Sequence, residues 1–176
     1  MKKVIKVLLA GLLLVFIALG LTGYNIVLPL SATANDRLNN SLPRAVSGKE
    51  LNPFSNYDFS QGEWSAYLVI VPEDFQDLHP LISKRICLKT DDINLLKQMQ
   101  KSWSFKCNEN GDMATVNSTF YLVHDGIVVF ETGIMLDKNN QGLQNEIYGW
   151  MKPVHGKEMV DVCSRFKKVY WPVVIL

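Results

Sequence analysis

The sequence predicts an α+β protein with an N-terminal transmembrane helix followed by one two-layer domain. The domain is expected to contain a mostly antiparallel sheet of about five to seven strands with two packed helices. Three observations support this: a long uncharged apolar block at the start, β-branched and aromatic runs separated by turns, and two segments with helical spacing of apolar residues. After the apolar block, roughly 140 residues remain, which is enough for one hydrophobic core.

Residues 7–30 form the apolar block, which contains no charged side chain. It exceeds the ~20 residues that span a bilayer as a helix. Lys2, Lys3 and Lys6 precede the block, and the next charge is Asp36. This asymmetry places the N-terminus in the cytoplasm and the domain outside, most simply in a bacterial inner membrane with a periplasmic domain.

A cleaved signal peptide is the alternative interpretation of residues 1–34. Such a peptide has an apolar region of about 7–15 residues followed by a small-x-small cleavage site. Ala32 and Ala34 supply that site, and cleavage near Ala34 would release the domain into the periplasm. An uncleaved anchor is favoured because the apolar block is long and the site lies far beyond its centre.

Residues 35–56 are predicted to form a flexible tether. The segment is polar and is interrupted by Pro43, Gly48 and Pro53. The packed extracytoplasmic domain is therefore expected to occupy residues 57–176.

The strands are assigned from clusters of β-branched and aromatic residues. These clusters are the segments EWSAYLVIVP, KRICLK, SFKC, ATVNSTFYLV, IVVFETGIML and VYWPVVIL. Pro172 places the last of them at a sheet edge. The segments TDDINLLKQMQKSW and GKEMVDVCSRFKK have apolar residues at three- and four-residue spacing, which predicts the two helices.

The longest hairpin is expected to turn at Asp125 and Gly126. Because His124 directly precedes Asp125, a catalytic pair is the alternative. The turn is favoured, since Gly126 supplies a positive φ and Asp125 tolerates the left-handed conformation. Adjacent strand residues also point to opposite faces, so the two side chains are not expected to converge.

Cys87 and Cys107 are predicted to form a disulfide, because pairing is the usual state of cysteines in an oxidising compartment. The bridge would close a loop of roughly 20 residues and stabilise the domain by about 3 kcal/mol. Cys163 lies on the apolar stripe of the last helix and is interpreted as a small buried hydrophobic residue. A reactive thiol or an intermolecular bridge is the alternative.

No catalytic, cofactor-binding or metal-ligating residue is predicted. His79, His124 and His155 are scattered, and none accompanies a nucleophile motif. The sequence has no zinc-ligand spacing, and the loop that begins at Asp137 lacks the bidentate acid of a calcium loop. Without the three leading lysines the chain has 15 basic and 17 acidic residues, so nucleic acid is not an expected partner.

A partner surface is predicted at Gln144, Tyr148, Trp150, Tyr170 and Trp171. Aromatic and flat amide side chains are typical of interface centres. The alternative is that the tryptophans cover the sheet as core residues.

These features together predict a membrane-tethered or secreted periplasmic binding domain that acts through protein–protein recognition. Its partner is expected to be another envelope protein, and the bilayer is contacted through residues 7–30. A protective inhibitor and an accessory subunit of an envelope complex both fit the sequence. The alternative is an envelope hydrolase that uses cysteine or histidine chemistry.

Overall fold

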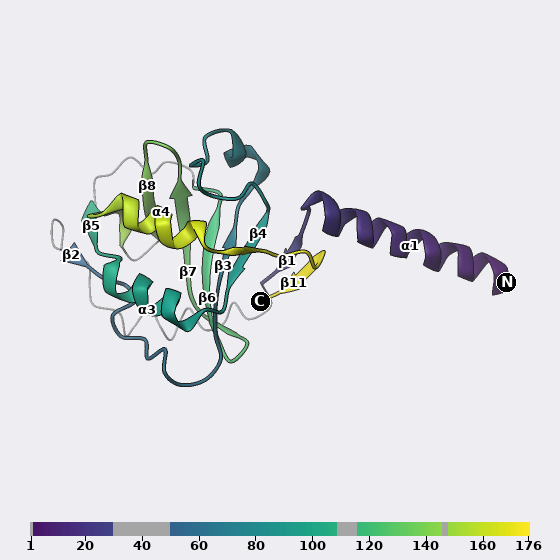
Figure 1. The fold of residues 1–176 in the computed structure, drawn as a ribbon, viewed down its shortest axis with the longest axis horizontal. Coiled ribbons are helices and arrows are strands. Elements are labelled where there is room, and N and C mark those ends of the chain that lie inside the picture. Colours follow the sequence, from purple (N-terminus) through teal and green to yellow (C-terminus); the bar gives the residue numbers. More distant parts are fainter. Residues whose placement is uncertain (1, 30–49, 109–115, 146–147) are drawn as a thin grey trace.

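A computed structural model of the chain describes residues 2–29, 50–108, 116–145 and 148–176. Helix α1 (Lys2–Thr22) projects from a domain in which two helices lie against one face of a sheet (Figure 1). The α+β class is confirmed, as is an N-terminal helix with the length and apolar composition of a membrane span or a signal sequence.

Within the described residues the main sheet has nine strands, and every neighbouring pair in it is antiparallel. In spatial order the strands are β10 (Lys167–Lys168), β4 (Cys87–Thr90), β3 (Trp64–Val69), β6 (Thr119–His124), β7 (Ile127–Leu136), β8 (Gln141–Asn145), β9 (Gly149–Pro153), β5 (Phe105–Asn108) and β2 (Glu50–Leu51).

The sheet therefore has more strands than the expected five to seven. Two of the additional strands, β2 and β10, have only two residues each and lie at the two ends of the sheet. Strands this short have no detectable alternation of apolar and polar residues, so a sequence pattern does not identify them.

The helix side of the main sheet is covered by α3 (Ile93–Ser102) and α4 (Gly156–Ser164). The Asp92 carboxylate accepts hydrogen bonds from the first turn of α3, which fixes where that helix begins. The helices bury Leu95, Leu96, Met99, Met159, Val160, Val162 and Cys163. These residues belong to the larger of two apolar clusters, and their helical spacing explains why both helices were predicted.

The opposite face of the main sheet carries a second apolar cluster of Cys87, Tyr121, Val123, Val128, Val174 and Leu176. It is covered in part by a separate parallel pair of strands, β1 (Ile26–Leu28) and β11 (Val173–Ile175). We call this pair the ribbon and this face the ribbon side. Strand β1 lies within the block expected to be one membrane span, so the helical part of that block ends at Thr22.

The expected turn between β6 and β7 is confirmed. Asp125 has φ 51° and Gly126 has φ 77°, which are the left-handed conformations that a two-residue hairpin turn requires. The side chains of His124 and Asp125 nevertheless approach to 3.5 Å between Nε2 and Oδ2, contrary to the expectation that they diverge. The left-handed backbone of Asp125 interrupts the strand alternation on which that expectation depended.

Part of the segment expected to be a tether belongs to the folded domain. Strand β2 pairs with β5, and Phe54 is fully buried between the rings of Trp103, Phe120 and Phe130. The remaining tether residues lie outside the described part of the chain. The packed domain thus includes residues 50–56, because the proline and polar residues around Phe54 form turns that deliver this side chain to the core.

Candidate functional site at the junction of α1 and the domain

The most distinctive feature of the structure is the place where α1 meets the domain. One stripe of the helix, formed by Phe16, Leu19 and Gly20, is shielded, while most of its surface is exposed. This spacing places the three residues on one helical face. The stripe lies against residues 170–172, which precede the last strand. We call this contact the junction.

The ribbon connects the residues that follow α1 with the last residues of the chain. Ile26 pairs with Val173, and Leu28 pairs with Ile175. The backbone N–H of Ile26 donates to the Pro172 carbonyl at 2.7 Å, and the N–H of Leu176 donates to the Leu28 carbonyl at 3.0 Å. The residues that follow the helix are therefore tied to the C-terminus by a regular ladder.

Arg85 is the central side chain of the junction. Its side chain is buried, with 6% of the residue exposed. The guanidinium donates one hydrogen bond to the Gly20 carbonyl, near the end of α1, and another to the Val169 carbonyl at 2.7 Å. The same group lies 4.4 Å from the centre of the Tyr170 ring. A cation at this position satisfies a carbonyl that the last turn of a helix leaves unpaired and interacts favourably with the helix dipole.

Asn25 provides a second polar contact at the junction. Its side-chain amide donates to the carbonyls of Val169 at 3.2 Å and Trp171 at 2.7 Å. The Val169 carbonyl thus accepts from both Arg85 and Asn25. Buried polar groups with such partners favour one relative position of helix and domain.

Close backbone approach explains the glycine at position 20. A β-carbon built on Gly20 would lie 2.6 Å from the carbonyl oxygen of Tyr170. By contrast, a β-carbon on Gly11, in the exposed part of α1, meets nothing within 4 Å. Gly20 is therefore a contact position, whereas Gly11 is not.

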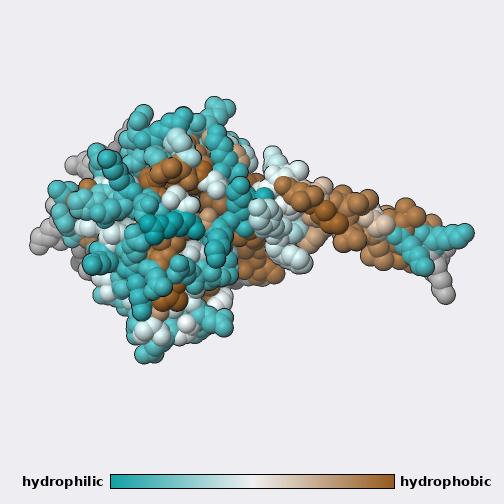
Figure 2. Space-filling model, viewed as in Figure 1, coloured by the Kyte–Doolittle hydropathy of each residue, from teal (hydrophilic) through white to brown (hydrophobic). Residues whose placement is uncertain are grey.

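Exposed apolar and aromatic side chains surround the junction. Tyr24, Tyr170 and Trp171 are 57%, 62% and 68% exposed. The rings of Trp171 and Phe16 meet edge to face with centroids 5.9 Å apart. Figure 2 shows hydrophobic surface along α1 and again on the adjoining part of the domain.

An open groove of about 530 Å³ begins beside the ribbon. Ile175 and Leu176 form one part of its lining, and Tyr67, Lys89 and Asp91 form another. The Lys89 ammonium lies 3.6 Å from the Asp91 carboxylate and 5.5 Å from the Tyr67 ring centre. The groove therefore combines apolar, aromatic and charged groups, a mixture suited to binding a polypeptide.

The predicted partner-surface residues do not form one surface. Gln144 and Trp150 are cross-strand neighbours in β8 and β9, but Tyr148 is 1% exposed and belongs to the helix-side core. Burial, with a smaller contribution from nearby Cys107, raises the pKa of Tyr148 to about 12. Only Tyr170 and Trp171 are strongly exposed together, and they lie beside α1.

The predicted disulfide between Cys87 and Cys107 is absent, and none of the three cysteines, all within the described ranges, is in a disulfide. Cys87 lies in β4 on the ribbon side, whereas Cys107 lies in β5 within the helix-side core. These strands are each second from opposite ends of the main sheet. The prediction failed because α3 connects two distant strands whose cysteines face opposite sides.

The thiols are also poorly placed for nucleophilic chemistry. Cys163 is fully buried, and burial raises its pKa far above the ordinary value. Burial likewise raises the pKa of Cys87 to about 12, although Arg85 and Lys89 oppose the shift. Because the thiolate is the nucleophile, neither thiol is activated.

His124 has structural contacts. His124 stacks on Trp64 with ring centroids 4.1 Å apart, and its Nε2 lies 3.2 Å from the Gln61 carbonyl. Asp125 accepts a hydrogen bond from the Glu63 N–H at 2.7 Å. Ser65 pairs with Val123, next to the Trp64–His124 pair. Because adjacent strand residues point to opposite faces, the Ser65 hydroxyl lies on the other face of the sheet from His124.

The junction was not anticipated from the sequence. Its signals were the glycines at positions 20 and 23, close to the end of the apolar block, and the aromatic C-terminal segment without charged side chains. The role of Arg85 could not be recognised, because it stands in a short segment between two lysines, a pattern typical of solvent-exposed residues. Comparison of the chain with family models, curated proteins and solved structures finds no match in any of the three.

Proposed function

We propose that the protein is a membrane-anchored extracytoplasmic binding protein that keeps α1 and recognises another envelope protein. One observation carries this proposal: residues 24–28, which precede the Ala32-x-Ala34 site, are built into the fold. Cleavage there would remove β1, the partner strand of β11, together with the helix end that Arg85 caps. A removable leader has no need of such contacts.

The orientation follows from charge. Lys2, Lys3 and Lys6 lie at the N-terminal end of α1, and the opposite end leads directly into the domain. Basic residues remain preferentially on the cytoplasmic side, so the domain lies outside the cytoplasm.

The groove beside the ribbon supports recognition of a protein. Its lining joins the apolar end of the chain to the Lys89–Asp91 pair and Tyr67. The buried, unactivated thiols give the hydrolase alternative no support. A binding role, as an inhibitor or as an accessory subunit, uses the groove without requiring a nucleophile.

The anchor is tested by the intact mass of the protein isolated from its native envelope. We expect a single species that retains residues 1–34. A mature protein that begins at Asn35 would contradict the proposal, because α1 and β1 would both be missing.

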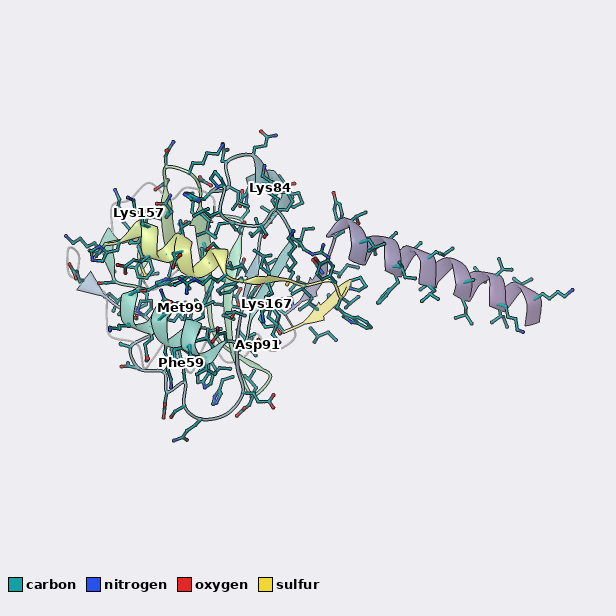
Figure 3. The ribbon with its side chains drawn as sticks, in the orientation of Figure 1. Phe59, Lys84, Asp91, Met99, Lys157 and Lys167 are labelled. Atoms are coloured by element: carbon teal, nitrogen blue, oxygen red, sulfur yellow. The ribbon has the colours of Figure 1, made fainter. Side chains whose placement is uncertain are left out.

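Recognition is tested by placing a photo-crosslinking amino acid at Asp91, in the groove, and at Lys157 as a control. Figure 3 shows Lys157 on α4 at the end of the domain away from α1. We expect a discrete protein adduct at position 91 that excess unlabelled full-length protein reduces, and none at position 157. Equal labelling at both positions, or none at either, would refute recognition through this groove.

A further inference from the structure

We infer that the ribbon and the aromatic residues beside it form a lipid-binding surface, which holds the domain flat against the bilayer. This inference rests on the proposed membrane anchor. It adds a second contact with the membrane, made by the folded domain itself. The surface consists of Tyr24, Ile26, Leu28, Trp171 and Ile175, and we call it the membrane face.

The position of Trp171 along α1 determines its depth in a bilayer that α1 spans. Trp171 contacts Phe16, which lies six residues before the end of α1 at Thr22. With a rise of 1.5 Å per residue, this contact is about 9 Å below the helix end. If α1 spans the bilayer, Trp171 must lie within the membrane or its interface.

Side chains of the ribbon point alternately toward the main sheet and away from it. Val27 and Val174 are paired and face the sheet, where they join the ribbon-side cluster. Their neighbours Ile26, Leu28 and Ile175 are 50%, 42% and 64% exposed and point away from the sheet. A contiguous exposed apolar face of this kind marks a binding surface.

Charged side chains are unevenly distributed around the ribbon and the junction. Residues 7–29 and 169–176 contain no charged side chain, although lysines stand at positions 167 and 168. Among the described residues of the junction, the charged side chain is Arg85, which is buried and donates to backbone carbonyls. The membrane face therefore has no charged side chain, and it includes tyrosine and tryptophan, the residues enriched where proteins meet the headgroup region.

Continuity with α1 identifies the occupant as lipid. The membrane face begins at the residue two positions after α1 and shares the Phe16–Trp171 contact with it. Lipid around a spanning α1 would reach this face without any additional component. The groove shares Ile175 with the membrane face, so the bound domain presents the groove close to the membrane surface.

The test uses nitroxide labels on single introduced cysteines in the full-length protein, reconstituted in phosphatidylcholine–phosphatidylglycerol vesicles. The introduced positions are Leu14→Cys in α1, Ile175→Cys on the membrane face and Lys157→Cys on α4. The native cysteines are buried, which favours labelling at the introduced sites. Collision with oxygen reports lipid, and collision with a water-soluble nickel chelate reports solvent.

We expect labels at positions 14 and 175 to collide severalfold more with oxygen than with the chelate, and the label at position 157 to show the reverse. If position 175 behaves like position 157 while position 14 remains in lipid, the membrane face is wrong and the anchor stands. If position 14 is also open to the chelate, the proposed anchor itself fails. A label at 175 that is shielded from both reagents and coupled to a second label would show a dimer interface, which also overturns the inference.

Discussion

The two faces of the main sheet are covered in different ways. On the helix side, α3 and α4 bury a continuous aromatic and aliphatic core. On the ribbon side, a smaller cluster is covered by the first and last strands of the chain, which meet next to α1. The helix side resembles the core of an ordinary soluble domain, whereas the ribbon side is connected to α1.

The two sides of the sheet therefore have different roles: one contributes stability to the fold, and the other determines the position of the domain relative to α1. The helix-side core accounts for most of the buried apolar side chains and therefore for most of the free energy of folding. The junction instead determines where the domain lies relative to α1. Changes on the two sides should consequently be distinguished by different measurements.

The largest effect is expected from Phe54→Ala on the helix side. Phe54 is fully buried among aromatic rings, so truncation should lower the free energy of unfolding by about 3–5 kcal/mol. Phe75→Ala is the matched control, because Phe75 packs only partly buried at the margin of the same core. Urea unfolding of the full-length protein in detergent measures both, and equal losses would show that residues 50–56 are not part of the core.

Arg85→Met should have the next largest effect. The substitution leaves the carbonyls of Gly20 and Val169 without their charged donor, which we expect to cost about 2–3 kcal/mol. Arg165→Met removes an exposed ion pair with Asp161 and should cost at most about 0.5 kcal/mol. Similar losses in the two variants would mean that Arg85 does not hold the junction.

Gly20→Ala should loosen the ribbon while leaving the helix side intact. The added methyl group would meet the Tyr170 carbonyl, so the helix end must move. We expect faster hydrogen exchange at the Ile26 and Leu176 amides and unchanged exchange in α3. Gly11→Ala, where the methyl group meets nothing, should change neither, and faster exchange in both variants would contradict the assignment of the contact.

The thiols on the two sides should differ in how they become reactive. Cys87 lies under the ribbon and should be alkylated through local opening, whereas Cys163 should react only on global unfolding. Both thiols should react slowly in the native protein at pH 8, because each is buried and burial raises its pKa. Mass spectrometry in increasing urea separates them, and rapid native reaction of Cys163 would revive the hydrolase alternative.

The smallest effect is expected from Asp137→Asn, at the end of β7. Burial, assisted by Asp74 and Asp77, raises the pKa of Asp137, so its contribution to stability is present at low pH and is lost as pH rises through the raised pKa. The substitution should therefore raise the melting temperature slightly at pH 7 and less at pH 4. Asp58 has a lowered pKa, caused mainly by the Ser60 side chain, and Asp58→Asn should have the opposite sign.

The helix side was largely predictable from the sequence. The β6–β7 hairpin was recognised because the residues at the turn themselves require a particular backbone conformation. The helices were recognised because their apolar spacing is local. Phe54 was missed because turn residues surround it and conceal a single buried anchor.

The ribbon side was not predictable in the same way. Strand β1 directly continues an apolar block, and hydropathy does not distinguish a strand from the end of a membrane helix. Its partner β11 lies at the opposite end of the chain, and no local rule connects them. The same limitation produced the wrong disulfide, because sequence spacing indicates neither the order of strands in a sheet nor the face on which a cysteine lies.

The junction should hold α1 in one position relative to the domain, and a distance measurement in vesicles tests this most directly. Nitroxide labels are placed at Leu12, in the exposed part of α1, and at Lys157, on α4. Pulsed electron–electron double resonance then measures the distance between the two labels. We predict one narrow distance distribution, which Arg85→Met broadens. A wild-type distribution spread over about 25 Å, the reach of a flexible linker of about 20 residues, would contradict the claim.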